Sequence, residues 1–425
     1  MFTIDDLEAH EILDSRGRPT VKASLLLSSG HSGTVSVPSG ASTGIHEAHE
    51  LRDGDPHRYR GNGCLKAVNS VRHIGAETAS RPWRSQQELD NFLIDLDGTP
   101  NKSRLGANAV LAVSLAFARA VAGAKSQSLW RHFASFRTDG ASMPAQLPSP
   151  TINLFSGGVH AGKQVALQDV LVLPLPERPI DEQMAAMAEV YACAVDLIAR
   201  DYGQRNLTAD EGGLAPTFKN THEMLAQADD CCRAAGLEPG IDYKLAIDAA
   251  ASHFHEDGRY YVDGKDLSTG ELISLYRTWC RAYPMHSIED GLAEDDWTGW
   301  QELCAELGDS TIVLGDDLLC TNPNRIRRAA GSACANALLL KVNQIGTLSE
   351  ARDALELARG YGWHVVVSAR SGETEDDWLA DLAVGWQADN IKVGSITQSE
   401  RLAKYNRLLY LGNRKPFDPE AGRLA

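Results

Sequence analysis

The sequence lacks the features that mark membrane and secreted proteins. No stretch approaches the roughly 20 consecutive apolar residues that a membrane-spanning helix needs. The opening residues, MFTIDDLEAHEILDSRG, contain no basic segment followed by an apolar core, which is the pattern of a secretory signal. We therefore expect a cytoplasmic protein that has no membrane partner.

Cysteine pairs and an excess of positive charge are missing as well. Eight cysteines are scattered without a C-x-x-C pair or a disulfide-like spacing, which favours buried, reduced thiols over a zinc or redox centre. The chain carries 41 Lys and Arg residues against 57 Asp and Glu, a formal net charge of −16, so no nucleic acid partner is expected. An anionic small-molecule substrate stays open, because a bound divalent metal can reverse the local field.

The length and the patterning predict two domains. At 425 residues the chain can hold a β/α barrel of about 250 residues and a second domain. Residues 1 to about 40 alternate between apolar and polar positions, as in PTVKASLLL, which predicts a small antiparallel sheet followed by helices. A segment rich in small and polar residues, 137–148, is the linker candidate. We predict an α+β cap over residues 1–136 and a barrel over residues 143–425.

Six short apolar runs in the second half of the chain each end in a residue able to do chemistry. Their end residues lie 41, 27, 25, 29 and 22 residues apart, and most of the sequence between them has helical composition. Alternating strands and helices, with a charge at each strand's carboxyl end, are typical of a β/α barrel active site. Two earlier apolar runs have no helix between them, so we expect the barrel to open with a hairpin. The six ends are Asp248, Glu289, Asp316, Lys341, Arg370 and Lys392.

Three successive runs end in a carboxylate, at Asp248, Glu289 and Asp316. Their side chains should converge at the mouth of the barrel. Hard oxygen ligands with no cysteine or histidine among them suit Mg²⁺ or Mn²⁺. The alternative is that each acid caps the helix that follows it. Three acids in consecutive strands favour the metal site.

Lysines and a further acid complete a possible proton-transfer site. Lys341 and Lys392 end buried strands, where desolvation and nearby metal charge favour the neutral, basic form of a lysine. Such a lysine can remove a proton from carbon beside a carboxylate, although a lysine at a strand end is often only a surface residue. The loop TADEGGLAP offers Glu211 as an acid, or merely as part of an acidic turn.

Two loops rich in small residues have the composition of lids. Residues 37–55 begin VPSGASTG, and their N–H groups and hydroxyls could surround an anion, but no lysine follows as a phosphate-binding P-loop requires. Residues 156–164, SGGVHAGKQ, carry His160. Each loop could equally be an ordinary flexible connection, since composition alone does not separate a lid from a linker.

Together these motifs resemble the enolase family over nearly the full length. The resemblance runs from DSRGRPTV at 14–21 to SERLAKYN at 399–406. It implies an α/β, enolase-like fold: an N-terminal α+β cap on a modified β/α (TIM-type) barrel that opens with an antiparallel hairpin. The other segments that carry it are PSGASTG, GGVHAG, DEGGLAP, SIEDGLAEDDW, GDDLLCTNP, LLLKVNQIGTLSEA and RSGETED.

The resemblance also implies a role for individual residues. Lys341 is the implied general base, Glu211 the acid that assists departure of hydroxide, and Lys392 the group that holds the substrate carboxylate. Two Mg²⁺ ions are implied, the tighter one held by Asp248, Glu289 and Asp316, and the second joined by Ser42. The remaining implied substrate contacts are Arg370, Ser371 and His160 at the phosphorus group, with Gln168 in the same site.

The chain departs from the family's pattern around the substrate. The family motif SHRSGETED reads SARSGETED, so Ala369 stands in place of an active-site histidine. The motif ALQE reads ALQD, which puts Asp169 at the hydroxyl end of the substrate, and IKTGAP reads IKVGSI after Lys392. The methyl group of Ala369 leaves space for an extra substrate group, and an added carboxylate there could be met by Lys163.

These departures favour a specialised relative of enolase. We expect a Mg²⁺-dependent dehydratase acting on a bulkier analogue of 2-phosphoglycerate, such as 2-phosphonoformylglycerate, which would give carboxyphosphonoenolpyruvate in a phosphonate antibiotic pathway. A housekeeping enolase that makes phosphoenolpyruvate, and a non-catalytic enolase-like scaffold, are the alternatives. Racemase-type relatives are disfavoured because no K-x-K pair precedes the three carboxylates. Family resemblance also implies a homo-oligomer, at least a dimer.

Overall fold

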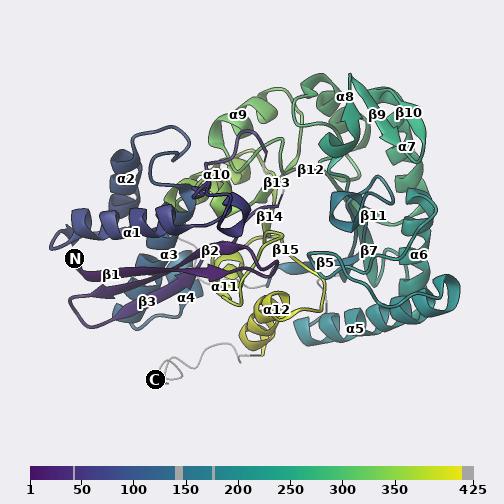
Figure 1. The fold of residues 1–425 in the computed structure, drawn as a ribbon. Coiled ribbons are helices and arrows are strands. Elements are labelled where there is room, and N and C mark those ends of the chain that lie inside the picture. Colours follow the sequence, from purple (N-terminus) through teal and green to yellow (C-terminus); the bar gives the residue numbers. More distant parts are fainter. Residues whose placement is uncertain (42–43, 139–146, 175–177, 414–425) are drawn as a thin grey trace.

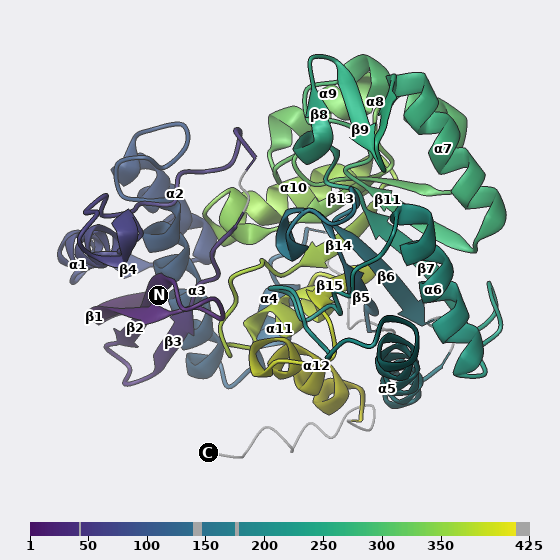
Figure 2. The same ribbon diagram turned by 45° about the vertical axis from the view of Figure 1, so that its right-hand side comes forward.

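The structure, a computed structural model, describes residues 1–41, 44–138, 147–174 and 178–413. It consists of an α+β cap formed by the N-terminal elements and a closed barrel formed by the rest of the chain, with α10 (Leu348–Gly360) lying between them (Figures 1 and 2). The predicted α/β fold class is confirmed. Most of the predicted linker, residues 139–146, lies outside the described residues, so the exact division into 1–136 and 143–425 stays a prediction.

The cap contains the antiparallel sheet predicted for the first 40 residues. Its strand order is β3-β2-β1-β4, and β2 alternates between buried and more exposed positions because one face packs on helices. Three longer helices and one short helix accompany the sheet. The elements are β1 (Phe2–Leu13), β2 (Pro19–Leu27), β3 (Ser32–Ser36), β4 (Pro82–Trp83), α1 (Leu65–Thr78), α2 (Gln86–Asp97), α3 (Ala107–Ala124) and α4 (Leu129–Ala134).

Helix α3 is the core helix of the cap. Its length and composition would allow it to cross a membrane, but 83% of its residues are buried inside the protein. It packs so closely on β3 that a Cβ atom at Gly33 would lie 2.2 Å from the Ala116 carbonyl oxygen. Apolar residues around most of its circumference therefore serve packing on several sides.

The barrel is closed in the order β11-β12-β13-β14-β15-β5-β6-β7. Strands β5 and β6 are antiparallel, as are β6 and β7, whereas all other neighbours are parallel. The predicted opening hairpin is therefore confirmed. The barrel strands are β5 (Ser149–Ser156), β6 (Asp169–Pro174), β7 (Tyr243–Asp248), β11 (Met285–Glu289), β12 (Ile312–Gly315), β13 (Ala337–Leu340), β14 (His364–Ser368) and β15 (Asn390–Gly394).

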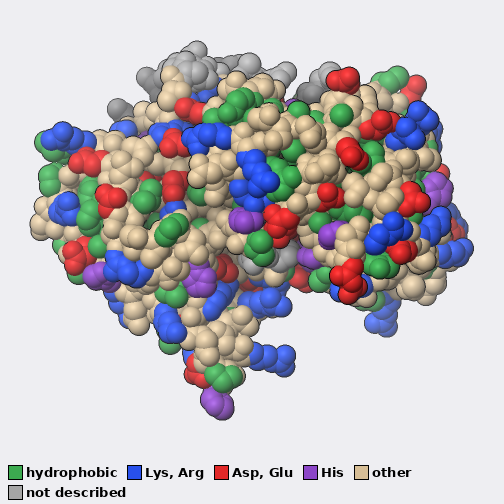
Figure 3. Space-filling view, turned by 90° about the horizontal axis from the view of Figure 1, so that it is seen from above, with side chains coloured by type: hydrophobic (Ala, Val, Ile, Leu, Met, Phe, Trp, Pro, Cys, Tyr) green, Lys and Arg blue, Asp and Glu red, His purple; other side chains and the backbone are tan. Residues whose placement is uncertain are grey.

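Helices cover the outside of the barrel, and α5 to α8 are seen along its outer side in Figure 2. A small sheet formed by β8 (His255–Glu256), β9 (Arg259–Val262) and β10 (Lys265–Leu267) is inserted after β7. The other helices of this half are α5 (Ile180–Leu197), α6 (Thr221–Ala234), α7 (Thr269–Ala282), α8 (Trp297–Leu307), α9 (Pro323–Gly331), α11 (Trp378–Gly385) and α12 (Ser399–Gly412). On the face shown in Figure 3, acidic and basic side chains are interspersed among the described residues.

Polar contacts fasten the cap to the barrel. Asp90 on α2 accepts hydrogen bonds from the backbone N–H (2.9 Å) and hydroxyl (2.6 Å) of Ser349 at the start of α10. Arg119 of α3 forms an ion pair of 2.7 Å with Asp376 of the barrel, and Lys102 pairs with Glu350. The cap is thus held in one position over the carboxyl ends of the barrel strands.

Candidate active site

The parallel strands of the barrel bring the predicted residues to one end of it. Strands β7 and β11 end at Asp248 and Glu289 themselves, and β12 and β13 end one residue before Asp316 and Lys341. Lys392 differs from the expectation, because it lies in the middle of β15 (Asn390–Gly394) and not at its end. Its side chain points into the barrel and is buried.

All of these residues except Glu289 line a cavity of about 460 Å³, including the part that is open to solvent. Ten of the predicted site residues line it, which shows that sequence positions as distant as His160 and Lys392 meet in space. Glu289, Asp169 and Lys163 are not among the lining residues, and Ser42 lies outside the described residues. The lining residues are His160, Gln168, Glu211, Asp248, Ala250, His253, Asp290, Asp316, Asp317, Lys341, Ser368, Ala369, Arg370, Ser371 and Lys392.

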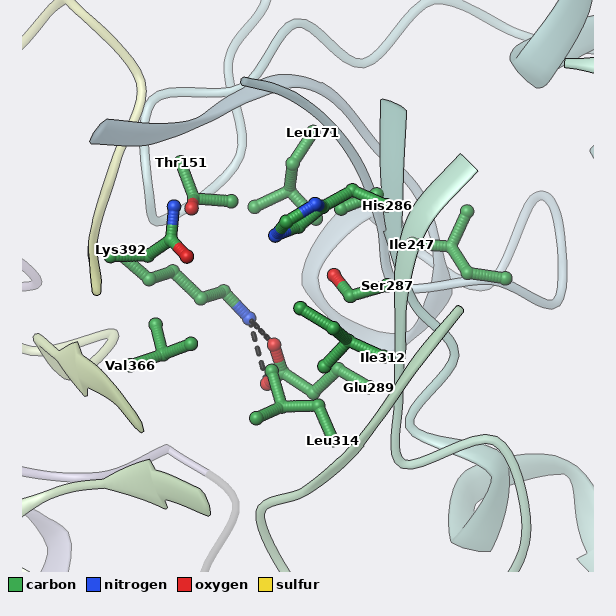
Figure 4. Close-up of a pocket in the computed structure, with 12 residues that line it drawn as sticks. Thr151, Leu171, Ile247, His286, Ser287, Glu289, Ile312, Leu314, Val366 and Lys392 are labelled. Carbon is green, nitrogen blue, oxygen red and sulfur yellow. Dashed lines mark hydrogen bonds and ion pairs between the residues drawn. The ribbon is translucent and has the colours of Figure 1, made fainter. Parts of the chain in front are cut away.

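Lys392 joins two of the three predicted metal ligands. Its Nζ lies 2.7 Å from Asp248 Oδ2 and 2.7–2.8 Å from both carboxylate oxygens of Glu289, as Figure 4 shows for Glu289. Burial by itself lowers the pKa of Lys392, but these carboxylates more than offset it and hold the pKa well above its ordinary value. Burial and the charge of Asp248 raise the pKa of Glu289 well above its usual range.

The third predicted ligand, Asp316, is held by two side chains from the next strand and its loop. Lys341 Nζ donates to Asp316 Oδ2, and Gln344 Nε2 donates to Oδ1 at 2.8 Å. Burial lowers the pKa of Lys341, yet the charges of Asp316 and Glu289 together outweigh burial and leave the pKa raised. The neutral form of Lys341, which we expect beside bound metal ions, stays a prediction, because here a carboxylate in direct contact stabilises the ammonium form.

The acids Glu211 and Asp169 have pKa values that are shifted in opposite directions. Burial, then the charges of Glu211 and Asp248, hold the pKa of Asp169 well above its ordinary value. Burial also acts on Glu211, but Arg401 and Lys392 outweigh it and lower its pKa. Asp169 is therefore the more readily protonated of the two acids, and its Oδ1 accepts from the Ser156 hydroxyl at 2.6 Å.

Both predicted lid loops are attached to the site. The backbone of Ser39 exchanges two hydrogen bonds with Gly372, at 2.8 and 3.0 Å, which joins residues 37–55 to the RSGETED segment. Farther along the same loop, Glu47 accepts from the Arg370 guanidinium at 2.9 and 3.1 Å. The Ser371 hydroxyl accepts from the Ala41 N–H at 2.9 Å.

The second loop presents His160 and Lys163. The loop turns through Gly162 and Lys163, both with positive φ, and a hydrogen bond of 2.6 Å from the Lys163 N–H to the Gly158 carbonyl closes it. Both ring nitrogens of His160 are buried without a hydrogen-bond partner among the described residues. Such an imidazole can donate to or accept from a bound molecule without first breaking a contact within the protein.

Two family models match the chain. The model described as "Enolase, N-terminal domain" matches residues 4–133, and the one described as "Enolase, C-terminal TIM barrel domain" matches residues 144–415. The chain belongs to the enolase family. It is accordingly a hydro-lyase of the enolase type, and the resemblance found in the sequence motifs is confirmed.

Members of the enolase family usually use Mg²⁺, and the donor set of this site fits that ion. Asp290, Asp316 and Asp317 offer oxygens within 4.8 Å of one another, a cluster that shares only Asp316 with the predicted three. Burial and the Asp316 charge raise the pKa of Asp317 to about 7. Asp290 accepts from the N–H groups of Asp316 and Asp317 at 2.9 and 2.8 Å, so its oxygens shape the turn. Hard oxygens and crowded negative charge suit a divalent cation.

Sequence reasoning missed a buried arginine that connects the loops of this enolase-type site. Arg401, on α12, has no exposed surface, and its guanidinium donates to the carbonyls of Arg370 (2.7 Å), Val393 (2.9 Å) and Ser371 (2.6 Å). The same side chain lowers the pKa of Glu211. The motif SERLAKYN contains Arg401, but a helical position gives no sign that its side chain reaches the segment after β14, strand β15 and the carbonyl of Asp210.

Proposed function

We propose that this hydro-lyase removes water from a carboxyphosphono analogue of 2-phosphoglycerate, 2-phosphonoformylglycerate, and forms carboxyphosphonoenolpyruvate. The enzyme class follows from the family, whereas this substrate is our proposal. The single observation that supports it is Ala369. The residue lines the cavity beside Arg370, is only 7% exposed, and contributes a methyl group where the family motif has an imidazole.

The proposed reaction is an elimination that uses one base and one acid. Lys341 in its neutral form takes the proton from the carbon next to the substrate carboxylate. The carbon–oxygen bond of the neighbouring carbon breaks, hydroxide leaves with a proton from the Glu211–Asp169 pair as water, and a carbon–carbon double bond forms. Mg²⁺ held by Asp248, Glu289 and Asp316 would supply positive charge that stabilises the doubly charged carboxylate and lowers the pKa of Lys341.

Other side chains would bind and orient the substrate. Arg370 and Ser371 would contact the phosphorus group, with His160 on the lid loop above it, and Lys392 and Gln168 would contact the carboxylate end. Arg370 forms an ion pair with Glu47, and Lys392 forms one with Glu289. Substrate binding would replace these internal ion pairs by ion pairs with the anionic substrate. We further propose that Ser42 joins a second Mg²⁺ and that Lys163 meets the added carboxylate.

The space beside Ala369 argues for the larger substrate. The backbone N–H of Ala369 donates to the Lys392 carbonyl at 2.8 Å, so the methyl group is held at a fixed place in the wall. Replacing an imidazole by a methyl group frees room for a carboxylate. A housekeeping enolase would lose a polar contact at this point, which usually costs on the order of 2–4 kcal/mol of transition-state stabilisation.

Conversion of 2-phosphoglycerate itself is the second candidate, favoured by the presence of every other predicted residue of the reaction. A comparison of turnover on both substrates separates the two. We expect kcat/KM to be at least tenfold higher for the carboxyphosphono substrate, and the variant Ala369→His to shift the preference toward 2-phosphoglycerate. Turnover of 2-phosphoglycerate alone, or an unchanged preference in the variant, would contradict the proposal.

The partners and cellular place of the protein are part of the same proposal. Family membership is compatible with a small anionic substrate and with a homo-oligomer. We propose at least a homodimer in the cytoplasm, in a pathway that makes phosphonate natural products. Size-exclusion chromatography with light scattering tests the oligomer directly, and a monomer at micromolar concentration would rule it out.

A further inference from the structure

We propose that His253 is a specificity-determining residue that binds the extra carboxylate of the substrate. The inference deepens the proposed function and rests on it. His253 is not part of any motif that carries the family resemblance, and it lines the same cavity as Ala369, Arg370 and Lys341. The cavity therefore contains the imidazole of His253 in addition to that of His160, although it lacks the imidazole of the SHRSGETED motif.

The backbone around His253 is fixed to the ends of the catalytic strands. The residue lies in the short helical turn Ala251–Phe254, which follows β7. His253 is five residues beyond Asp248 in the sequence. Ala249 N–H donates to the Glu289 carbonyl at 2.9 Å, and Ala251 N–H donates to the Asp290 carbonyl at 3.0 Å. These bonds continue the β7–β11 pairing beyond the strand ends, so the backbone that carries His253 has a defined position at the cavity wall.

The ring of His253 contains a polar atom that no group in the described part of the chain satisfies. Its Nδ1 atom is buried and has no hydrogen-bond partner among the described residues. Buried polar atoms normally have one, and an exception calls for a reason such as a ligand. His255, two residues later, shows the contrast. Its ring packs against Tyr260 with a centroid distance of 4.6 Å, and it is not among the residues that line the cavity.

Basic groups of the lid loop lie close to the same ring. Burial lowers the pKa of His253, the charge of Asp248 opposes this, and His160 and Lys163 lower it further. Two basic side chains from residues 156–164 are thus near enough to act on His253 electrostatically. A carboxylate placed among the three would find a hydrogen-bond donor and two neighbouring basic groups, and an anion there raises the proton affinity of each imidazole.

The prediction separates binding of the carboxylate from binding of the phosphono group. The probes are phosphonoformate, which has both groups on adjacent atoms, and methylphosphonate, which has the phosphono group alone. Affinities are measured by calorimetry at a fixed, saturating Mg²⁺ concentration. We expect His253→Leu to weaken phosphonoformate at least tenfold and methylphosphonate less than twofold. His253→Asn, whose amide replaces the Nδ1 atom, should recover most of the loss, and His255→Leu should match the wild type.

Each outcome either supports or overturns the assignment of His253 to the extra carboxylate. An equal loss for both probes, or no loss for either, would overturn the assignment of His253 to the carboxylate, as would a failure of His253→Asn to recover affinity while the protein stays folded by circular dichroism. The proposed function fails separately, if the wild type turns over 2-phosphoglycerate and not 2-phosphonoformylglycerate. Selective loss of phosphonoformate binding would still stand in that case, because neither probe reacts.

Discussion

At the scale of single residues, the site pairs each lysine with carboxylates. Lys392 contacts Asp248 and Glu289, and Lys341 contacts Asp316. Two ammonium groups and three carboxyl groups in a buried space compensate one another's desolvation, and removing one partner leaves an uncompensated charge. The same contacts keep both ammonium groups protonated, so a base at Lys341 depends on a second cation that competes for Asp316.

Lys341 provides the sharpest test of catalysis at this scale. We expect Lys341→Ala to lower kcat by about 10³-fold or more, because a positioned base contributes on the order of 10²–10⁴ and no other lysine contacts Asp316 among the described residues. The measurement is steady-state turnover, with thermal denaturation to check folding. Lys102→Met is the matched control, since Lys102 is also buried and paired with a carboxylate, Glu350. Full activity of Lys341→Ala would rule out Lys341 as the base.

At the scale of elements, helices of the cap and barrel meet around a buried acid. Asp90 on α2 is fully buried and accepts hydrogen bonds from Ser349 of α10 and from Gln86 Nε2 at 2.9 Å. Burial raises its pKa to about 6, although these hydrogen bonds oppose the shift. The contact between α2 and α10 therefore contains a group that titrates near neutral pH.

The protonation of Asp90 makes stability depend on pH. Its folded-state pKa of about 6 exceeds the ordinary value of 3.8, so the folded protein binds the proton more tightly. The resulting stability is fully present below pH 3.8 and is lost as the pH rises through 6, by roughly 3 kcal/mol. The urea midpoint of the wild type should rise relative to that of Asp90→Asn between pH 7 and pH 5. Parallel pH profiles of the two proteins would contradict this.

At the scale of the whole molecule, the cap completes a site that the barrel begins. The loop 37–55 belongs to the cap, yet it reaches the barrel through Ser39, Ala41 and Glu47. Arg401 holds the loops on the barrel side together. The cavity therefore has its shape only when the cap is docked on the barrel. A divalent cation bound at Asp316 would stabilise this arrangement of the two parts.

Mg²⁺ should raise the thermal midpoint of the whole protein. A hundredfold excess over its dissociation constant corresponds to about 2.7 kcal/mol, or roughly 3 °C for a chain of this size. Differential scanning calorimetry with Mg²⁺ and with excess chelator measures the shift, and activity should disappear in chelator and return with Mg²⁺. Asp316→Asn should abolish the shift, and Asp229→Asn, a buried acid near Tyr243, should retain it. Activity that persists in chelator would rule out the metal.

Much of the fold could be predicted because local patterns are strong here. Apolar runs of four to six residues with helical segments between them define a β/α barrel, and the strand ends at Asp248 and Glu289 are as expected. Lys392 was misplaced relative to its strand, because a short run gives no sign of where pairing stops. The contact of Glu47 with Arg370 spans 323 residues of sequence, and no local signal encodes it.

The sequence by itself determined the family through its motifs, and it determined the fold class and the reaction class because strand periodicity and a set of charged strand ends are local properties that one chain displays directly. Only the tertiary structure decided which charges touch. Lys392 contacts both Asp248 and Glu289, the charges of Glu211 and Asp248 help to raise the pKa of Asp169, and His253 lines the cavity with a buried Nδ1 atom that has no hydrogen-bond partner among the described residues. The physical reason is that pKa and hydrogen bonding depend on distances of a few ångströms between residues that are far apart in the chain.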